Sequence, residues 1–294
     1  MILEPNKTLN NDIFLTCKID YTSFKKTVKK LVSFNSDYVK MEFTNNALTF
    51  ITVNDRKTDV AFVKLRYNTI LNGLDTFELN IDIKEIHEFL SLFDFNNFNK
   101  FINYDLNDDN HNISAEIVVC KQNLLDSGRK NGILKLTNNL NSIGEHTITN
   151  YHVDLNYKIP TNIKFDYMIS FSSTQFENLY NKILKFGECV EINCDENTIS
   201  FEISNQNTKF IFNYLHSAEN NVDDDSKTVK IIKNNIAPED VKVKEKFKLS
   251  EKNNINKFTD TSNTVELFLK NGHPMFIRHN IYDMGSCAVG IMNV

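Results

Sequence analysis

The most constraining feature of this chain is that a pattern in its first half recurs in its second half. The segment F-K-K-T-V-K-K-L-V-S-F, which begins at Phe24, aligns with F-E-N-L-Y-N-K-I-L-K-F, which begins at Phe176. After a one-residue deletion, the alternating apolar positions from Val39 onward align with those from Val190 onward. A helix-period pattern followed by two period-two patterns therefore occurs twice. This predicts two copies of one domain and not a solenoid, whose repeats are about 20–50 residues long.

The length of 294 residues suits two such domains, each large enough to bury a core. We place an N-terminal domain at residues 1–150, an interdomain connector at 151–166 and a C-terminal domain at 167–294. Pro160 interrupts regular structure inside the connector.

Periodicity predicts an α+β fold, in which each half has two helices on one face of a mostly antiparallel sheet. Helices are expected at about 21–34, with Thr22 or Ser23 as N-cap, and at 82–93, 173–186 and 250–259. The expected strands cover residues 13–19, 38–43, 48–53, 60–67, 77–81, 98–104, 113–119, 167–171, 189–193, 198–203, 209–215, 247–249, 264–269, 275–281 and 288–292.

Two polar segments depart from this pattern. Residues 121–146 are interpreted as an extended hairpin or loop. Residues 217–245 contain Asp223-Asp224-Asp225 and are interpreted as a mobile acidic excursion.

Composition restricts the compartment and the mode of nucleic-acid binding. The net charge of −5 disfavours coating by nucleic acid over the whole surface but allows a local basic stripe. The five cysteines include no C-x-x-C pair, which indicates free thiols in a reducing compartment. The N-terminus does not resemble a signal peptide, and no apolar run approaches the roughly 18 residues that cross a bilayer. We therefore expect a soluble intracellular protein without a membrane partner.

Lysines recur on the predicted helices opposite the apolar face. On the first helix, Phe24, Val28 and Leu31 lie on one side of the helical wheel. A solvated amphipathic face is the ordinary interpretation of such a helix, but its recurrence at equivalent places in an acidic chain favours a functional basic surface. The second helix fits less well because Glu85, Glu88 and Asp94 are acidic. The lysines concerned are Lys25, Lys26, Lys29, Lys30, Lys84, Lys182, Lys185, Lys252 and Lys257.

The sequence contains none of the common catalytic motifs. G-x-x-x-x-G-K-[ST], G-x-G-x-x-G, H-E-x-x-H and G-x-S-x-G are absent, and only 8 glycines are available for phosphate-binding loops. The seven histidines lack metal-ligand spacing. We expect no enzymatic activity, no metal and no cofactor.

Three segments resemble the sliding clamps of the proliferating cell nuclear antigen family. They are L-F-L-K-N-G-H-P-M-F-I-R-H-N-I-Y-D-M-G (267–285), the connector I-P with F-D-Y-M-I-S-F-S-S-T-Q-F (159–160 and 165–176), and K-I-L-K-F-G-E-C-V-E-I-N-C (182–194). The resemblance implies a ring, most often a homotrimer of six similar domains, whose helices surround duplex DNA. Such a clamp tethers DNA polymerase and other replication and repair proteins, is served by a clamp loader, and acts in the nucleus or, for a virus, in a cytoplasmic replication factory.

The resemblance also implies roles for individual residues. It assigns Lys25, Lys26 and Lys257 to the DNA-facing surface, and the helical wheel adds the other six lysines. Basic positions of the family are replaced by Glu88 and Ser91 on the second helix and by Asn178 and Asn181 on the third. The family's apolar pocket for partner peptides corresponds to Val53, Phe62, Ile159, Pro160, Phe165, Pro274 and Ile291, while Met292-Asn293 replaces an Ala-Pro pair.

Two alternatives remain open at this point. The missing cations and the polar insertions also suit a clamp-fold scaffold that does not encircle DNA, such as a viral transcription factor. A related possibility is that the chain is one subunit of a heteromeric clamp.

Overall fold

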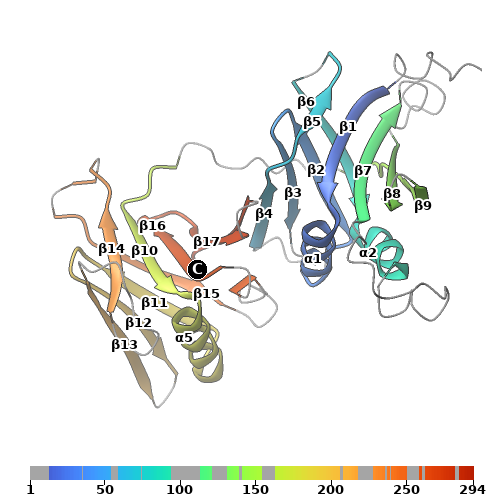
Figure 1. Cartoon of the computed structure of the whole chain (residues 1–294). Coiled ribbons are helices and arrows are strands. Elements are labelled where there is room, and N and C mark those ends of the chain that lie inside the picture. Colours follow the sequence, from blue (N-terminus) through green and yellow to red (C-terminus); the bar gives the residue numbers. More distant parts are fainter. Residues whose placement is uncertain are drawn as a thin grey trace, which may run out of the picture. The chain divides into compact units, whose positions relative to one another are not determined.

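The computed structural model forms two compact units (Figure 1). The first unit comprises Met1–Thr52 and Lys64–Asn156, and the second comprises Val53–Val63 and Tyr157–Val294. The boundary between residues 156 and 157 falls within the range predicted for the connector. The residues that the structure describes are 13–34, 36–53, 59–73, 75–93, 113–120, 131–138, 141–153, 163–205, 208–217, 228–235, 237–238, 240–249, 258–259, 262–281 and 285–294.

Two groups of antiparallel strands build the first unit. The five-stranded sheet has the order β5-β1-β7-β8-β9 and consists of β1 (Ile13–Asp20), β5 (Thr69–Leu71), β7 (Ile113–Cys120), β8 (Gly132–Asn138) and β9 (Asn141–Ile148). The other group has the order β3-β2-β6 and consists of β2 (Tyr38–Thr44), β3 (Ala47–Val53) and β6 (Thr76–Asp82). Alternate side chains of β1, β2 and β6 enter the core, whereas β3 is buried along its whole length. β4 (Asp59–Leu65) is divided between the units.

Helix α1 (Tyr21–Val32) begins one residue after a carboxylate cap. The Asp20 side chain accepts a hydrogen bond from the Ser23 backbone N–H at 2.7 Å. The prediction of Thr22 or Ser23 as N-cap was therefore wrong, because the last residue of β1 already supplies the acceptor that the first helical turn needs.

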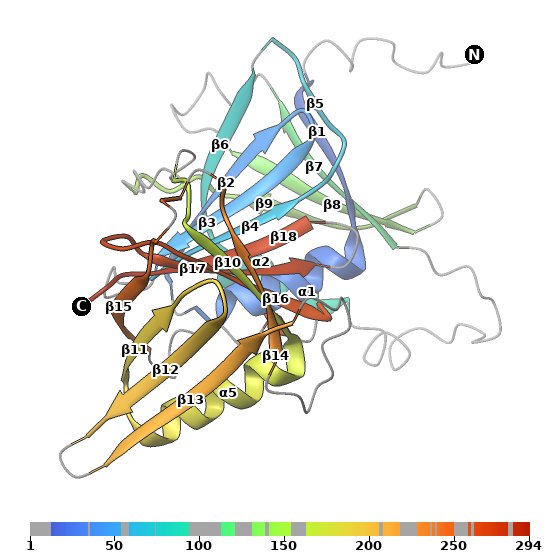
Figure 2. The same ribbon diagram turned by 90° about the vertical axis from the view of Figure 1, so that its left-hand side faces the viewer.

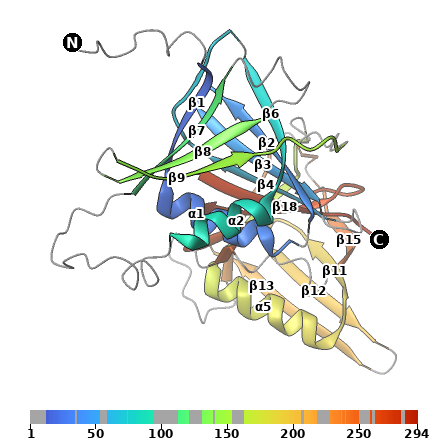
Figure 3. The same cartoon turned by 90° about the vertical axis from the view of Figure 1, so that its right-hand side faces the viewer.

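Helix α2 (Ile83–Leu92) lies beside α1 on the first unit (Figure 3). Its own cap is Asp82, whose carboxylate accepts from the Lys84 N–H at 2.8 Å. The Tyr21 hydroxyl at the start of α1 donates to the Leu90 carbonyl at 3.2 Å and to that of Phe93 at 3.1 Å. These bonds fix the start of α1 against the end of α2.

One run of strands builds the second unit, in the order β15-β11-β12-β13-β14-β10-β16-β17-β18. Helix α5 (Ser173–Phe186) packs through Phe176, Leu179, Tyr180 and Ile183 on β10, β12 and β16 (Figure 2). β13 and β14 pair in parallel, and the other pairings in this run are antiparallel. The strands are β10 (Tyr167–Ser172), β11 (Cys189–Cys194), β12 (Thr198–Ser204), β13 (Lys209–His216), β14 (Thr228–Lys233), β15 (Val243–Lys248), β16 (Thr264–Leu269), β17 (Met275–Ile281) and β18 (Gly285–Ile291).

The structure corrects a second prediction, that of the acidic segment, and leaves others untested. The prediction of a mobile acidic excursion at 217–245 was wrong for the later part of that range. There, β14 places Val229 and Ile231 in the core at 0% and 5% exposure. The hairpin predicted within 121–146 is confirmed as β8–β9, while β5 was not anticipated. The strand predicted at 98–104 lies outside the described residues, as does most of the fourth helix, of which only Phe258 and Thr259 are described, in a short 3₁₀ turn.

Candidate functional site

Helix α1 concentrates positive charge on its solvent side. It carries four lysines and no carboxylate in 12 residues, while Phe24, Val28 and Leu31 are buried beneath it. Lys29 and Lys30 lie in the last turn, where the negative end of the helix dipole stabilises cations. The sequence therefore maintains an unbalanced basic face on a helix that is fixed by its core side.

The α1 lysines differ in their surroundings. Lys26 and Lys29 are exposed, whereas Lys25 and Lys30 are half-buried. The Lys25 ammonium lies 5.6 Å from the centre of the Tyr21 ring, within the range of a cation–π contact. All four lie within three turns of helix, so together they form a basic patch that suits a polyanion.

Helix α2 does not extend this patch. Lys84 forms a 3.2 Å ion pair with Asp37, with side chains 50% and 76% exposed. Such a surface pair contributes little to stability, but it offsets the charge of Lys84. Glu88 is exposed, and Glu85 accepts a 2.7 Å hydrogen bond from the Tyr151 hydroxyl. That bond, reinforced by burial and the nearby negative charge, raises the pKa of Tyr151 to about 12.

Helix α5 carries a weaker basic surface. Lys182 and Lys185 are exposed, but Glu177 and the two asparagines noted above, Asn178 and Asn181, share the solvent side. The helix begins at a serine cap, where the Ser172 hydroxyl accepts from the backbone N–H of residue 175 at 3.1 Å. The remaining predicted cations, Lys252 and Lys257, lie outside the described residues.

The predicted partner pocket is only partly represented at the surface. Val53, Phe62 and Ile291 are core residues with 8%, 6% and 1% exposure, so they could form the floor of a pocket but offer little surface. Phe165 and Pro274 are half-buried. Ile159 and Pro160 lie outside the described residues.

Phe165 instead lines a groove of about 500 Å³ in the second unit. We call it the outer-face groove, and its apolar lining consists of Ile163, Phe165, Met168, Ile232 and Phe268. Sequence reasoning missed four of these residues, Ile163, Met168, Ile232 and Phe268. The available signal was that M-I-S-F, K-I-I-K and L-F-L place apolar residues on both faces of their strands.

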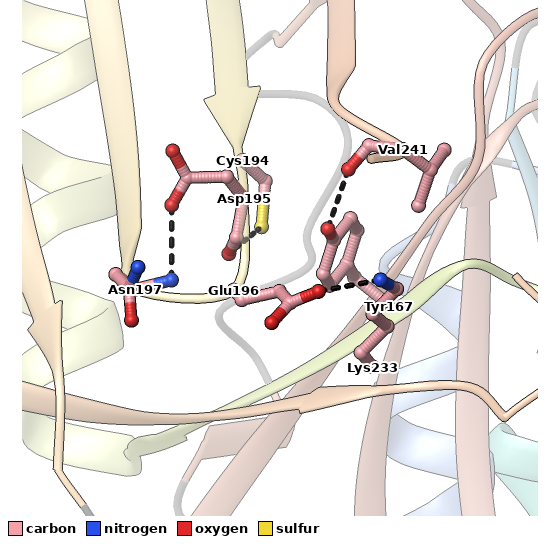
Figure 4. Close-up of polar contacts among 7 residues, drawn as sticks. All are labelled: Tyr167, Cys194, Asp195, Glu196, Asn197, Lys233 and Val241. Carbon is pink, nitrogen blue, oxygen red and sulfur yellow. Dashed lines mark hydrogen bonds and ion pairs between the residues drawn. The ribbon is translucent and has the colours of Figure 1, made fainter. Parts of the chain in front are cut away.

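Polar contacts fix one side of the outer-face groove (Figure 4). The Lys233 ammonium pairs with Glu196 at 2.5 Å, and the Tyr167 hydroxyl donates to the Val241 carbonyl at 2.6 Å. Burial is the main cause that raises the pKa of Tyr167 to about 12. In the turn that carries Glu196, burial raises the pKa of Asp195, but hydrogen bonds from the N–H groups of residues 197 and 198 and the Thr198 hydroxyl outweigh it and lower that pKa. These contacts are structural and create no nucleophile.

Among the described residues, β9 and β13 each have a backbone edge that lacks a partner strand over much of its length. β9 is the last strand of the five-stranded sheet of the first unit. β13 pairs with β12 along its length but with β14 only at Leu215 and His216, so residues 209–214 leave one edge open. Ile211 and Leu215 of β13 are 49% and 58% exposed. Open edges with exposed apolar side chains are suited to pairing with another chain.

Comparison with known protein families shows which family the second unit resembles. Residues 158–292 match the family described as Proliferating cell nuclear antigen, C-terminal domain. Over this range, the chain is similar to the C-terminal domain of that family. The matched range lies within the second unit and contains β10, α5 and β11–β18. A search of curated proteins found no match to the chain.

The described residues contain neither a candidate metal site nor a candidate membrane-spanning helix. No group of three or more His, Cys, Asp or Glu side chains there is arranged to hold a metal ion. None of the helices in the described part of the chain has the length and apolar character needed to cross a membrane.

Proposed function

We propose that this protein is a DNA sliding clamp, a processivity factor that encircles duplex DNA and tethers DNA polymerase and other replication and repair proteins. The observation that carries the proposal is the basic face of α1 in a chain whose second unit is similar to the proliferating cell nuclear antigen C-terminal domain. The protein acts as a scaffold without chemistry of its own, and a clamp loader places it on DNA.

Salt-sensitive contacts suit this task. Each lysine that meets a phosphate releases condensed counterions, so the contacts are individually weak and allow sliding. A closed ring then prevents dissociation by topology and not by affinity. In this proposal Lys25, Lys26, Lys29 and Lys30 supply most of the contacts, because Lys84 is paired and α5 carries mixed charge.

We further propose that the ring is a homotrimer closed by head-to-tail contacts. The open edge of β13 on one copy would meet the open edge of β9 on the next. Because these are different surfaces, the contact is heterologous, and a heterologous contact closes into a ring when its rotation permits. Partner proteins would insert a short apolar segment near Phe165 and Pro274.

Retention on DNA tests the topological claim. The clamp is loaded onto nicked circular DNA, the DNA is linearised, and the bound protein is measured at moderate salt. Loss of protein after linearisation is expected, because the ring slides off the ends. Retention that linearisation does not change would contradict encirclement.

Mass in solution tests the assembly. Sedimentation should give three copies of the 34.1 kDa chain. Ile211→Glu should dissociate them by placing a charge at the β13 edge, whereas Ile70→Glu, at a 63% exposed isoleucine of β5, should not.

A clamp-fold scaffold that does not encircle DNA is the second candidate. It is favoured by the acidic and paired residues of α2 and by the polar surface of α5. A monomer at micromolar concentration, together with retention that does not depend on DNA topology, would select this candidate. A chain that does not self-assemble but joins a related subunit would indicate a heteromeric clamp.

A further inference from the structure

One strand of the second unit carries a lysine at every second position. Residues 241–248 have the sequence V-K-V-K-E-K-F-K, and most of this segment is β15. Val243 and Phe247 are buried in the core at 1% and 0% exposure. Because alternate side chains of a strand point to opposite faces of the sheet, the intervening lysines share the other face. All four are exposed, and we call them the β15 lysine row: Lys242, Lys244, Lys246 and Lys248.

The row lies on the face of the sheet that α5 does not cover (Figure 2). Ile192 of β11 and Phe201 of β12 line a small cavity together with Leu179 of α5, so these strands turn their buried side chains toward the helix. Glu191, the chain neighbour of Ile192, lies opposite Lys246 in the register of β11 and β15. The lysine row and α5 are therefore on opposite faces.

Protection of a sheet edge does not explain the row. Lysines on a border strand commonly prevent pairing with another chain, and β15 is such a strand. Its outer edge, however, is already bonded within the chain. The Asn271 side chain accepts from the Lys244 backbone N–H at 2.9 Å and donates to the Lys242 carbonyl at 2.7 Å. The Val294 N–H donates to the Lys246 carbonyl at 2.9 Å, so the backbone of the row is held in place.

Neighbouring carboxylates engage two of the lysines without covering them. Lys244 pairs with Glu191 and Lys248 with Glu188, each at 3.2 Å. The two lysine side chains remain 69% and 52% exposed. Ion pairs at the surface contribute little free energy, so these lysines can exchange their partners for a carboxylate of another molecule.

We propose that the β15 lysine row binds an extended acidic segment of a partner protein, in which aspartate or glutamate occupies every second position. Alternate side chains of extended chains recur every 6.4–6.8 Å or so, roughly the same repeat on both molecules, so each carboxylate meets one lysine over about 20 Å. The contact is made by side chains across the face of the sheet and not by addition of a strand, because the edge of β15 is bonded. Charge complementarity selects this partner over a basic one.

A nucleic acid fits the row less well. Single-stranded nucleic acids bind through aromatic side chains that stack on their bases. On this face, the described side chains of β15 and of its neighbour β11 include no aromatic ring: apart from the lysines they are Cys189, Glu191 and Asn193. Phosphates at every nucleotide would also face Glu188 and Glu191, whereas an alternating peptide places uncharged residues there.

The proposal is independent of the other sites in this protein. None of the four lysines lines the outer-face groove. The proposal concerns only the second unit, so it does not depend on encirclement of DNA.

Peptide binding to the full chain tests the proposal. The probe is a fluorescein-labelled peptide, Gly-Glu-Thr-Glu-Thr-Glu-Thr-Glu-Gly, measured by fluorescence anisotropy at about 50 mM salt. An isomer, Gly-Glu-Glu-Glu-Glu-Thr-Thr-Thr-Gly, keeps the composition and the charge and removes the alternation. The alternating peptide is expected to bind at least about threefold more tightly than the isomer, and to lose affinity as salt screens the charges.

Variants locate the binding. Lys242→Gln with Lys246→Gln leaves both ion pairs of the row in place and should weaken the alternating peptide about fivefold. The matched variant Lys64→Gln with Arg66→Gln removes two exposed cations at alternate positions of the first unit and should leave binding unchanged. Unchanged urea midpoints confirm that both variants fold. Acetylation of lysines, measured by mass spectrometry, should show that the peptide protects Lys246 but not Lys26 of α1.

Three results would overturn the proposal. The first is equal binding of the two isomers, and the second is equal affinity of the two variants for the alternating peptide. The third is an oligothymidylate that binds more tightly than the peptide and loses its affinity in the Lys242, Lys246 variant, which would assign the row to nucleic acid. Retention on circular DNA, measured on the same variants, reports separately on the clamp function.

Discussion

Removal of the two exposed α1 lysines, Lys26 and Lys29, should reduce the salt dependence of DNA binding. The double variant Lys26→Gln, Lys29→Gln leaves the buried face of the helix intact. Each lysine that contacts a phosphate contributes about 0.9 to the slope of log affinity against log salt concentration. Loss of two contacts should therefore lower the slope by about 1.8.

The slope predicts a measurable difference in affinity. Between 50 and 200 mM salt, a change of about 1.8 in slope makes the affinity of the unaltered protein fall about twelvefold more than that of the variant. Anisotropy of a labelled linear duplex, titrated at several salt concentrations, measures both slopes. Linear DNA is suitable because it reports the contacts without requiring a loaded ring.

A charge-matched control separates contact from net charge. Lys64→Gln with Lys246→Gln removes the same charge from two exposed strand positions. The control should keep the slope of the unaltered protein. If the salt slope fell by the same amount in the α1 variant and in the control, the effect would come from net charge and not from contacts of α1. If the α1 variant kept its slope, α1 would not be the DNA-facing helix.

Three further predictions concern the cores of the units. Cys120 is half-exposed and should react with a maleimide at pH 8 much faster than Cys17 or Cys194. Burial raises the pKa of the Cys17 thiol to about 11 and that of the Cys194 thiol to about 12, so at pH 8 about one in a thousand of these thiols or fewer is a thiolate. Equal modification rates, measured by mass spectrometry, would refute this. The pKa of Asp195 is lowered in the folded protein, so the carboxylate stabilises the fold above about pH 4 and this stabilisation is lost as the pH falls through the pKa of the folded state. Asp195→Asn should therefore make the urea midpoint of unfolding fall less between pH 5 and pH 2. A fall as large as that of the unaltered protein would contradict the lowered pKa. Gly144→Ala should destabilise the protein by about 1–3 kcal/mol, because a Cβ there would lie 2.5 Å from a ring atom of Phe93, the residue that caps the end of α2. An unchanged unfolding midpoint would show that the ring moves aside without cost.

The elements that the sequence predicted well are those whose apolar period is long and uninterrupted. α5 was predicted at 173–186 and occupies Ser173–Phe186, and α1 ends two residues before its predicted limit. In both helices the apolar side chains recur every three to four residues, so one face must be buried whatever the fold around it. The lysine face of α1 follows from the same spacing.

Other features depended on contacts between residues far apart in the chain. The short segment T-V-K-I-I-K becomes β14 because β10 supplies its hydrogen bonds, and local polarity gave no sign of that partner. Lys84 is paired only because the fold places Asp37 beside it.

The outer-face groove shows the same division between local and non-local information. Period-two alternation tells which side chains share a face within one strand, but only the register between strands aligns Met168 with Ile232 and Phe268. The sequence by itself therefore determined the three helices that the structure describes, most of the described strands and the basic face of α1. The tertiary structure decided which strands are neighbours, and thus which charges are offset and where apolar side chains meet at the surface, because strand pairing depends on contacts between distant segments.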